Sequence, residues 1–241
     1  MCGFQENDEM TGRKELKFLC DDRTLIQVEN RIKGVMKRDI HQDGDSYEIR
    51  SIYFDSPSDR CYYENQSGTG TRSKYRIRIY NCDGDYIRAE VKSKYYDTTK
   101  KVSTKISRDQ FKLLKKRGSL EMLFTGENRD ATALKQFADK VYAEGFSPAA
   151  IVRYDRSAYT YSPCNVRVTF DRNISACTAF DHFFDPAMPA RPVCEPGIHV
   201  LEVKYDEFLP DHICTLLMAG DMRRTSFSKY YMARNMLMGR T

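Results

Sequence analysis

The sequence lacks several features that would assign it to a common class of protein. Its 241 residues contain no apolar run near the ~20 residues that a membrane-spanning helix needs. The first ten residues, MCGFQENDEM, are polar and acidic, which argues against a secretory signal peptide. No GK[ST] follows Gly68-Thr69-Gly70, so a flexible loop is expected there rather than a P-loop. No Ser/His/Asp or Cys/His arrangement for nucleophilic catalysis stands out.

Cysteine and histidine are too scattered to predict a metal site. The eight cysteines form no CxxC pair, and the four histidines show no ligand spacing. Without a signal peptide, eight reduced thiols in a cytoplasmic protein are the expected state. The histidines are expected to be structural or exposed; they are His41, His182, His199 and His212.

What is present is the composition of a folded α+β protein. The chain is 41% hydrophobic and 30% charged, and its 16 Tyr and 13 Phe are unlike a disordered chain. Residues 1–12 are expected to be a flexible leader and residues 13–241 a single domain. About eight strand segments and four or five helices predict an α+β fold. Ser107 and Gln110 form a capping-box pattern, which predicts that a helix begins there.

The strand segments share an unusual distribution of charge. Side chains alternate between the two faces of a strand, and six segments place their charged residues on one face and apolar residues on the other. In KYRIRIY (74–80), the cations Lys74, Arg76 and Arg78 share a face. One such row is ordinary for a strand with a solvated face. Six rows rich in Lys and Arg are not, because such cations repel unless an anion lies between them.

A sheet of this width tends to curl or to close. With its charged faces inward it would form a basic tunnel, which predicts a long, phosphate-rich ligand. The few glutamates on these faces are then candidates for holding a divalent cation against phosphate oxygens. Two plainer interpretations remain open. Arg76 and Arg78 could pair with glutamates of neighbouring strands, and Glu202 could be only a counter-ion of Lys204.

Eight segments, taken in chain order, resemble one known family. They are RKELKF (13–18), SIYFDSPSDRCYYE (51–64), KYRIRIYN (74–81), RAEVKSK (88–94), VRYDRSAYTY (152–161), VRVTFDRNI (166–174), VLEVKYDEFLP (200–210) and RRTSFSKYYMAR (223–234). Together they resemble the VTC (vacuolar transporter chaperone) domain, also called the polyphosphate polymerase domain, of the triphosphate tunnel (CYTH-like) superfamily. The resemblance extends over residues 13–238 and is to stand-alone, bacterial-type members.

The resemblance implies a closed antiparallel β-barrel with flanking helices, whose tunnel binds ATP, triphosphate and inorganic polyphosphate. It also implies transfer of the ATP γ-phosphate to a growing polyphosphate chain, with Mn²⁺ or Mg²⁺ as cofactor. By motif, the phosphate-binding residues would be Lys17, Arg76, Arg78, Lys92, Lys105, Arg156, Arg167, Lys204 and Lys229. The catalytic set would be Arg76, Arg78, Lys204 and Glu202, with Glu202 as the metal ligand.

Two departures from the family pattern leave other functions open. The first strand has RKELK (13–17) where the hydrolases of the superfamily often have ExExK, so one potential metal ligand is missing. The SPX domain and membrane helices that accompany the eukaryotic polymerases are also not found in this sequence, and the question of a membrane partner stays open. One alternative is a metal-dependent tripolyphosphatase or nucleoside triphosphatase, in which Glu15 or Glu90 would orient water. Another is a non-enzymatic protein that binds polyphosphate.

Nucleic acid is not expected as a partner. Stacking platforms for single strands need aromatic and cationic side chains on the same face of a sheet. In KYRIRIY (74–80), the aromatic residues are expected on the face opposite the cations.

Overall fold

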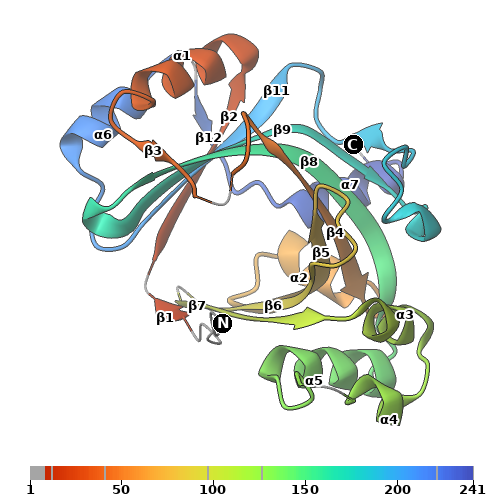
Figure 1. The fold of residues 1–241 in the computed structure, drawn as a ribbon. Coiled ribbons are helices and arrows are strands. Elements are labelled where there is room, and N and C mark those ends of the chain that lie inside the picture. The colour runs from red at the N-terminus through yellow and green to blue at the C-terminus, as the bar shows by residue number, and fades with distance from the viewer. Residues whose placement is uncertain are drawn as a thin grey trace.

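The computed structural model describes most of the chain. The described residues are 9–11, 13–40, 42–96, 98–125, 127–220 and 222–240. They form a twelve-stranded sheet that curls around a central space, with most of the helices outside it (Figure 1). Of the expected leader, residues 1–8 and 12 lie outside the described residues, and Glu9–Thr11 forms strand β1.

Ten strands form the continuous path of the sheet, and every pair in it is antiparallel. In sheet order they are β1 (Glu9–Thr11), β7 (Thr98–Ile106), β6 (Ile87–Tyr95), β5 (Thr71–Tyr80), β4 (Tyr47–Asp55), β8 (Ser147–Tyr161), β9 (Val166–Cys177), β11 (Ile198–Tyr205), β2 (Lys14–Asp21) and β12 (Arg223–Arg224). Two short strands lie beside this path: β3 (Lys37–Arg38) pairs with β8, and β10 (Arg191–Pro192) pairs with β9.

The sheet is curled but not closed, which corrects the expectation of a closed barrel. Its edge strands are β1 and β12, and in the described part of the chain no hydrogen-bonded ladder joins them. These edge strands contain three and two residues, so backbone pairing ends at each edge after a few bonds. Side chains instead make a contact between the two ends of the sheet: Lys92 Nζ of β6 lies 3.3 Å from Glu15 Oε2 of β2.

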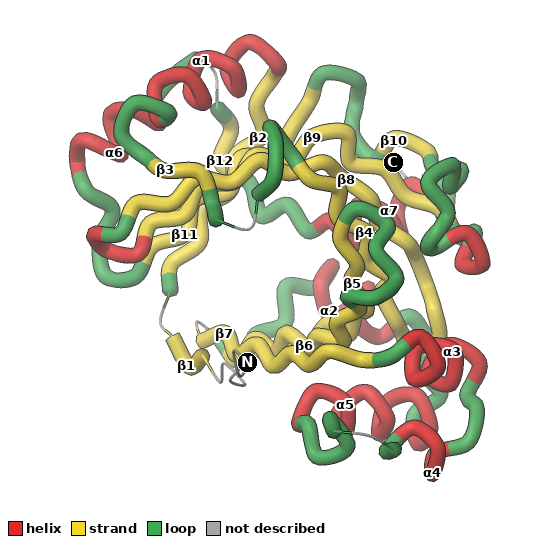
Figure 2. Tube along the Cα trace, viewed as in Figure 1, coloured by secondary structure: helices red, strands yellow, loops and turns green. Residues whose placement is uncertain are grey.

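Most of the helices lie on the outside of the curled sheet, whereas α2 (Arg60–Gln66) and α7 (Lys229–Leu237) lie at one end of its interior (Figure 2). The helices are α1 (Asp22–Ile32), α2 (Arg60–Gln66), α3 (Arg108–Lys116), α4 (Leu120–Leu123), α5 (Thr132–Ala138), α6 (Asp211–Leu217) and α7 (Lys229–Leu237). The capping box predicted at Ser107 and Gln110 is confirmed, because both of its reciprocal hydrogen bonds are present at the start of α3. Within the described ranges, none of the helices is long and apolar enough to cross a membrane.

Two apolar cores explain why the charged face points inward. In one, α1 and α6 cover the outer faces of β9 and β11, burying residues such as Val28 and Phe170. In the other, α3 and α5 cover the outer faces of β5, β6 and β7, burying residues such as Ile77 and Phe137. Burial of apolar area on the outer face stabilises the fold, and the alternation of side chains then directs the charged residues into the curl.

Candidate functional site

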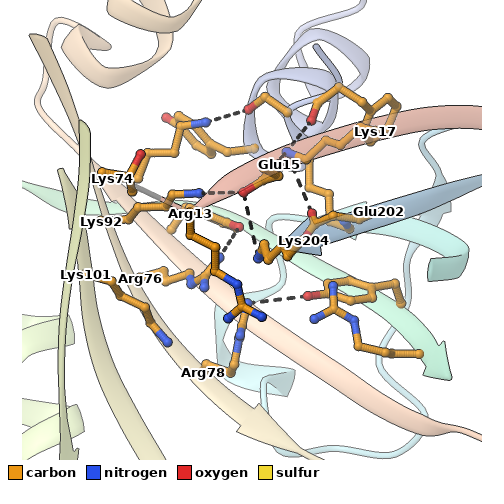
Figure 3. Close-up of a pocket in the computed structure, with 18 of the residues that line it drawn as sticks. Arg13, Glu15, Lys17, Lys74, Arg76, Arg78, Lys92, Lys101, Glu202 and Lys204 are labelled. Carbon is orange, nitrogen blue, oxygen red and sulfur yellow. Dashed lines mark hydrogen bonds and ion pairs between the residues drawn. The ribbon is translucent and has the colours of Figure 1, made fainter. Parts of the chain in front are cut away.

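The inner face of the sheet encloses a strongly basic cavity of about 290 Å³ (Figure 3). Eleven of its nineteen lining residues are cations: Arg13, Lys17, Lys74, Arg76, Arg78, Lys92, Lys101, Arg156, Arg167, Lys204 and Lys229. Two lining residues, Glu15 and Glu202, are acids. Carboxylates behind the wall, such as Glu90 and Asp171, offset part of this charge, and a multiply charged anion would neutralise the excess that remains.

The structure brings nine of the ten expected site residues together in this cavity. These are Lys17, Arg76, Arg78, Lys92, Arg156, Arg167, Glu202, Lys204 and Lys229. Lys105 is not among the lining residues, and its Nζ lies 5.6 Å from the centre of the Tyr86 ring. The β7 lysine in the lining is Lys101, which lies four residues before Lys105 on the same face of the strand.

Three lining cations were not among the expected site residues. Arg13, Lys74 and Lys101 also line the cavity. The alternation of side chains could have identified them, because Lys74 and Lys101 continue rows of charged residues on β5 and β7, and Arg13, directly before β2, continues the row of Glu15 and Lys17.

Buried Glu90 organises the first group of cations. Its carboxylate lies 2.7 Å from Arg76 Nε, 2.7 Å from Lys101 Nζ and 3.7 Å from Arg78 Nη1. Burial favours the neutral acid, but Arg78, Arg76 and Lys101 outweigh it and hold the pKa of Glu90 well below its usual range. Glu90 is therefore a permanent anion that fixes two guanidinium groups at the cavity wall.

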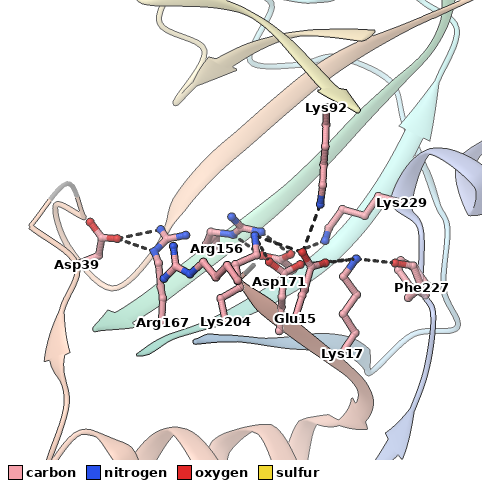
Figure 4. Close-up of polar contacts among 12 residues, drawn as sticks. Glu15, Lys17, Asp39, Lys92, Arg156, Arg167, Asp171, Lys204, Phe227 and Lys229 are labelled. Atoms are coloured by element: carbon pink, nitrogen blue, oxygen red, sulfur yellow. Dashed lines mark hydrogen bonds and ion pairs between the residues drawn. The ribbon is translucent and has the colours of Figure 1, made fainter. Parts of the chain in front are cut away.

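Asp171 organises a second group on the opposite wall (Figure 4). Arg156 donates to both of its oxygens, at 2.6 and 2.7 Å, and Lys229 Nζ lies 2.5 Å away. Burial raises the pKa of Asp171, but Arg156 and Lys229 outweigh burial and bring it to about 2. This second buried anion joins β8, β9 and the first residue of α7.

Glu15 and Glu202 form a third group, on the adjacent strands β2 and β11. Lys17 Nζ lies 2.7 Å from Glu15 and 3.9 Å from Glu202, and Lys204 Nζ lies 2.7 Å from Glu202 and 3.8 Å from Glu15. Burial and the charge of Glu202 raise the pKa of Glu15, but Lys17, Lys204 and Lys92 outweigh them and hold it at about 2. The pKa of Glu202 also lies well below its usual range, because Lys204 and Lys17 outweigh its burial. Both side chains are therefore ionised.

This pair of carboxylates fits a divalent cation that takes its remaining ligands from phosphate. Mg²⁺ is commonly held by one or two carboxylates together with substrate phosphates. Glu15 and Glu202 share Lys17 and Lys204 as partners, so the two carboxylates lie close together. Among the described residues, no group of three or more His, Cys, Asp or Glu could hold a metal ion, so this pair would depend on phosphate oxygens for the remaining ligands.

Lys74 differs from the other cations that line the cavity. Its Nζ donates to Ser228 Oγ at 2.7 Å, and in the described ranges no carboxylate lies within 4 Å of it. Burial and the neighbouring Lys17 and Lys92 lower the pKa of Lys74 to about 7. A bound anion would supply the negative partner that Lys74 lacks.

Helix α7 closes one end of the site and is held there by Asp55, the last residue of β4. Asp55 accepts hydrogen bonds from Cys61 N and Tyr62 N at the start of α2, at 2.8 and 3.0 Å. It also accepts one from the hydroxyl of Tyr230 on α7. This buried junction places the neighbouring Lys229 at the cavity.

The aromatic residues of β5 do not all lie opposite its cations. Tyr75 is buried on the outer face against Phe137 and Phe146, as expected. Tyr80 shares the face of Arg78, because the two lie two positions apart in one strand, with only Ile79 between them. The expectation is therefore confirmed for Tyr75 and wrong for Tyr80.

A curled antiparallel sheet that gathers cations around buried carboxylates has the architecture of an anion-binding tunnel. The family model of the VTC domain matches residues 12–238, nearly the whole chain. The chain therefore belongs to the VTC domain family, and this membership supports a function in binding triphosphate-type ligands. No curated protein matches the sequence.

Solved structures resemble the chain only distantly. A protein from Pyrococcus horikoshii is 16% identical, with 95% of this chain and 99% of that one covered and a TM-score of 0.46. A candidate adenylate cyclase from Bacillus halodurans is 15% identical, with 86% and 87% covered and a TM-score of 0.46. Another, from Vibrio parahaemolyticus, is 11% identical, with 86% and 83% covered and a TM-score of 0.45. These likenesses are too weak to bear on function.

Proposed function

We propose that the protein is a polyphosphate polymerase, which transfers the γ-phosphate of ATP to a growing polyphosphate chain inside the cavity. The observation that carries this proposal is the composition of the cavity wall, where eleven cations face two acids. Mn²⁺ or Mg²⁺ would be the cofactor, and Glu202 and Glu15 would hold it. When bound, such an ion neutralises charge that develops on phosphate oxygens.

The cations that bind phosphate are held in place before a ligand arrives. Arg76 and Arg78 are fixed by Glu90, and Arg156 is fixed by Asp171. Each guanidinium keeps N–H groups beyond those that contact its carboxylate. Cations that need not move to meet the developing charge stabilise a phosphoryl-transfer transition state most effectively.

The proposed transfer needs no proton acceptor from the protein. An ionised terminal oxygen of the acceptor chain attacks the γ-phosphorus in line and forms a new P–O–P bond. The bond from the γ-phosphorus to the β–γ bridging oxygen breaks, and ADP leaves. The lysines and arginines of the cavity bind the phosphates and hold acceptor and donor in line.

Hydrolysis suits the cavity less well than transfer to phosphate. An attacking water must be oriented and must also lose a proton, and the carboxylates that could orient it are Glu15 and Glu90. Glu15 has a pKa of about 2 and Glu90 one well below its usual range, so both are weak bases at neutral pH.

The proposal is tested by incubating the purified protein with ATP and Mn²⁺ and separating the products. Polyphosphate together with ADP is the expected result. Free phosphate without polyphosphate would contradict the proposal and identify a hydrolase. If neither product forms although polyphosphate binds, the protein is a non-enzymatic polyphosphate-binding protein.

A further inference from the structure

Beyond Arg78, the cavity face of the sheet continues into a cluster of tyrosines and cations. The cluster consists of Tyr47, Tyr80, Tyr86, Arg88 and Lys105, and we refer to it as the tyrosine cluster. Strand register places it next to the phosphate site, because Arg78 pairs with Arg88 and Arg88 pairs with Lys105. Tyr80 lies two residues beyond Arg78 on the same face of β5.

The three tyrosine rings form a row that begins at the cavity wall. The centre of the Tyr47 ring lies 6.1 Å from that of Tyr80, which lies 6.0 Å from that of Tyr86. The hydroxyl of Tyr47 accepts a hydrogen bond of 3.5 Å from Nη2 of Arg167, which lines the cavity. All three tyrosines are partly exposed. The row therefore leads from the phosphate site towards solvent.

The two cations of the cluster lie over an aromatic ring rather than beside an acid. The Arg88 guanidinium lies 5.9 Å and Lys105 Nζ 5.6 Å from the centre of the Tyr86 ring. Arg88 also donates to the Tyr86 hydroxyl, at 2.9 Å. Neither cation has a carboxylate within 4 Å in the part of the chain that the structure describes. Both remain available to an anionic group of a ligand.

We infer that the tyrosine cluster binds the nucleoside of the nucleoside triphosphate whose phosphates occupy the cavity. This inference rests on the proposed function. Aromatic rings and guanidinium groups stack on nucleobases whatever the base. A polyphosphate chain has no flat apolar group, so it would gain nothing from three ring faces. The cluster therefore distinguishes the end of the cavity that takes the nucleotide from the end that takes the chain.

The two ends of the cavity differ in the way this assignment requires. At the far end from the tyrosine cluster, Lys17 donates to the Phe227 carbonyl, and Lys74 donates to Ser228. In the described part of the chain, no tyrosine row lies beside these two lysines. Lys17 also contacts Glu15 and Glu202, and Lys74 has only the hydroxyl as a partner among the described residues, which suits successive phosphates of a chain. The acceptor polyphosphate accordingly occupies the end near α7, and the nucleoside occupies the end with Tyr86.

Tyr86→Leu tests the inference, because it removes a ring face but keeps an apolar side chain of similar size. Binding of ATP and of tripolyphosphate is measured by calorimetry, with EDTA present to prevent turnover. Tyr86→Leu should weaken ATP binding by about fivefold or more, the loss of one stacked base. Its affinity for tripolyphosphate should not change, because that ligand has no nucleoside.

Two variants serve as matched controls. Tyr86→Phe keeps the ring and should retain most of the ATP affinity. Tyr95→Leu makes the same change at the opposite end of β6, on a side chain that is 65% exposed, and should alter neither affinity.

Equal losses for both ligands in Tyr86→Leu, or a loss for neither, would overturn the inference while leaving triphosphate binding intact. Failure of the wild-type protein to bind tripolyphosphate would instead contradict the proposed function. A second measurement uses wild-type protein alone, should Tyr86→Leu not fold. ATP should bind more tightly than ribose 5-triphosphate, which has no base, and equal affinities would overturn the inference.

Discussion

At the scale of single residues, the cavity cations differ in how their charge is balanced. Arg76 and Arg156 each contact a buried carboxylate, so their charge and orientation are fixed. Lys74 donates only to a hydroxyl, and its pKa of about 7 makes it the cavity cation whose charge depends most on pH near neutrality. Ligand binding should therefore be linked to protonation at this lysine.

Binding of tripolyphosphate should weaken as the pH rises from 6.5 to 8.5. A bound polyanion favours the charged form of Lys74, so binding above pH 7 requires the uptake of a proton. Lys101, with a pKa of about 8, should add to the effect. Lys74→Arg should show a smaller pH dependence, because arginine stays charged. Calorimetry at both pH values measures this, and identical pH dependence in the two proteins would contradict it.

Glu202→Gln should separate binding from turnover. The change keeps the volume of the side chain but removes a charged ligand for the metal. The affinity for tripolyphosphate in EDTA should stay the same or increase, because Lys204 and Lys17 lose a carboxylate that competes with the ligand. Turnover of ATP with Mn²⁺ should fall by about 100-fold.

The control for this variant is Glu207→Gln, the same chemical change at an exposed position nearby. Its turnover should match that of the wild type. Full turnover in Glu202→Gln would show that Glu202 is only a counter-ion of Lys204.

At the scale of secondary-structure elements, α7 places the cationic side chain of its first residue at the inner face of the sheet. Its N-terminal residue is Lys229, which contacts Asp171, and the next residue is Tyr230, which donates to Asp55. Arg234, one turn further on, pairs with Asp59 ahead of α2. The helix is thus anchored on its far side while its first turn faces the cavity.

Tyr230→Phe should lower the free energy of unfolding by about 1–3 kcal/mol, because it leaves the buried Asp55 carboxylate without one hydrogen bond. The stacking of this ring on Tyr53 is kept, so the loss is that of the hydroxyl. Tyr231→Phe on the same helix should change stability by less than about 0.5 kcal/mol. Urea unfolding measures the free energy of unfolding of both variants. A Tyr230→Phe protein as stable as Tyr231→Phe would contradict the account.

The sequence predicted the rows of cations well, because alternation is a property of each strand. Eight of the nine expected residues that line the cavity lie on strands and follow this alternation, whereas Lys229 lies on α7 and was expected only from the family motif. The sequence did not predict the position of Lys105, because alternation defines the face of a strand but not the distance along a tunnel. Nor did it predict α2, whose first turn is held by Asp55, a contact between distant segments. The prediction of a closed barrel was wrong, because pairing between the edge strands depends on their length and on the distance between them.

At the scale of the whole molecule, the apolar residues that stabilise the fold and the charged residues of the candidate site lie on opposite faces of the sheet. The apolar cores lie on the outer face of the sheet, under the helices, so the inner face can hold repelling charges. That repulsion opposes folding, and a bound polyanion removes it. Ligand should therefore stabilise the folded protein markedly.

Tripolyphosphate at about 100 times its dissociation constant should raise the melting temperature by about 5–10 °C at low salt. The shift should shrink as NaCl is added, because salt screens the exposed part of the cavity charge. Differential scanning fluorimetry measures both effects, with NaCl of equal ionic strength as the control. No shift at low salt would contradict the account.

The most direct test of the central claim is a crystal structure of the protein with tripolyphosphate. The account predicts phosphates inside the curled sheet, in contact with Arg76, Arg78 and Arg156. Their oxygens should lie within hydrogen-bonding distance of these guanidinium groups, which should remain held by Glu90 and Asp171. Tripolyphosphate bound only on the outer surface, with the cavity cations still paired among themselves, would contradict the claim.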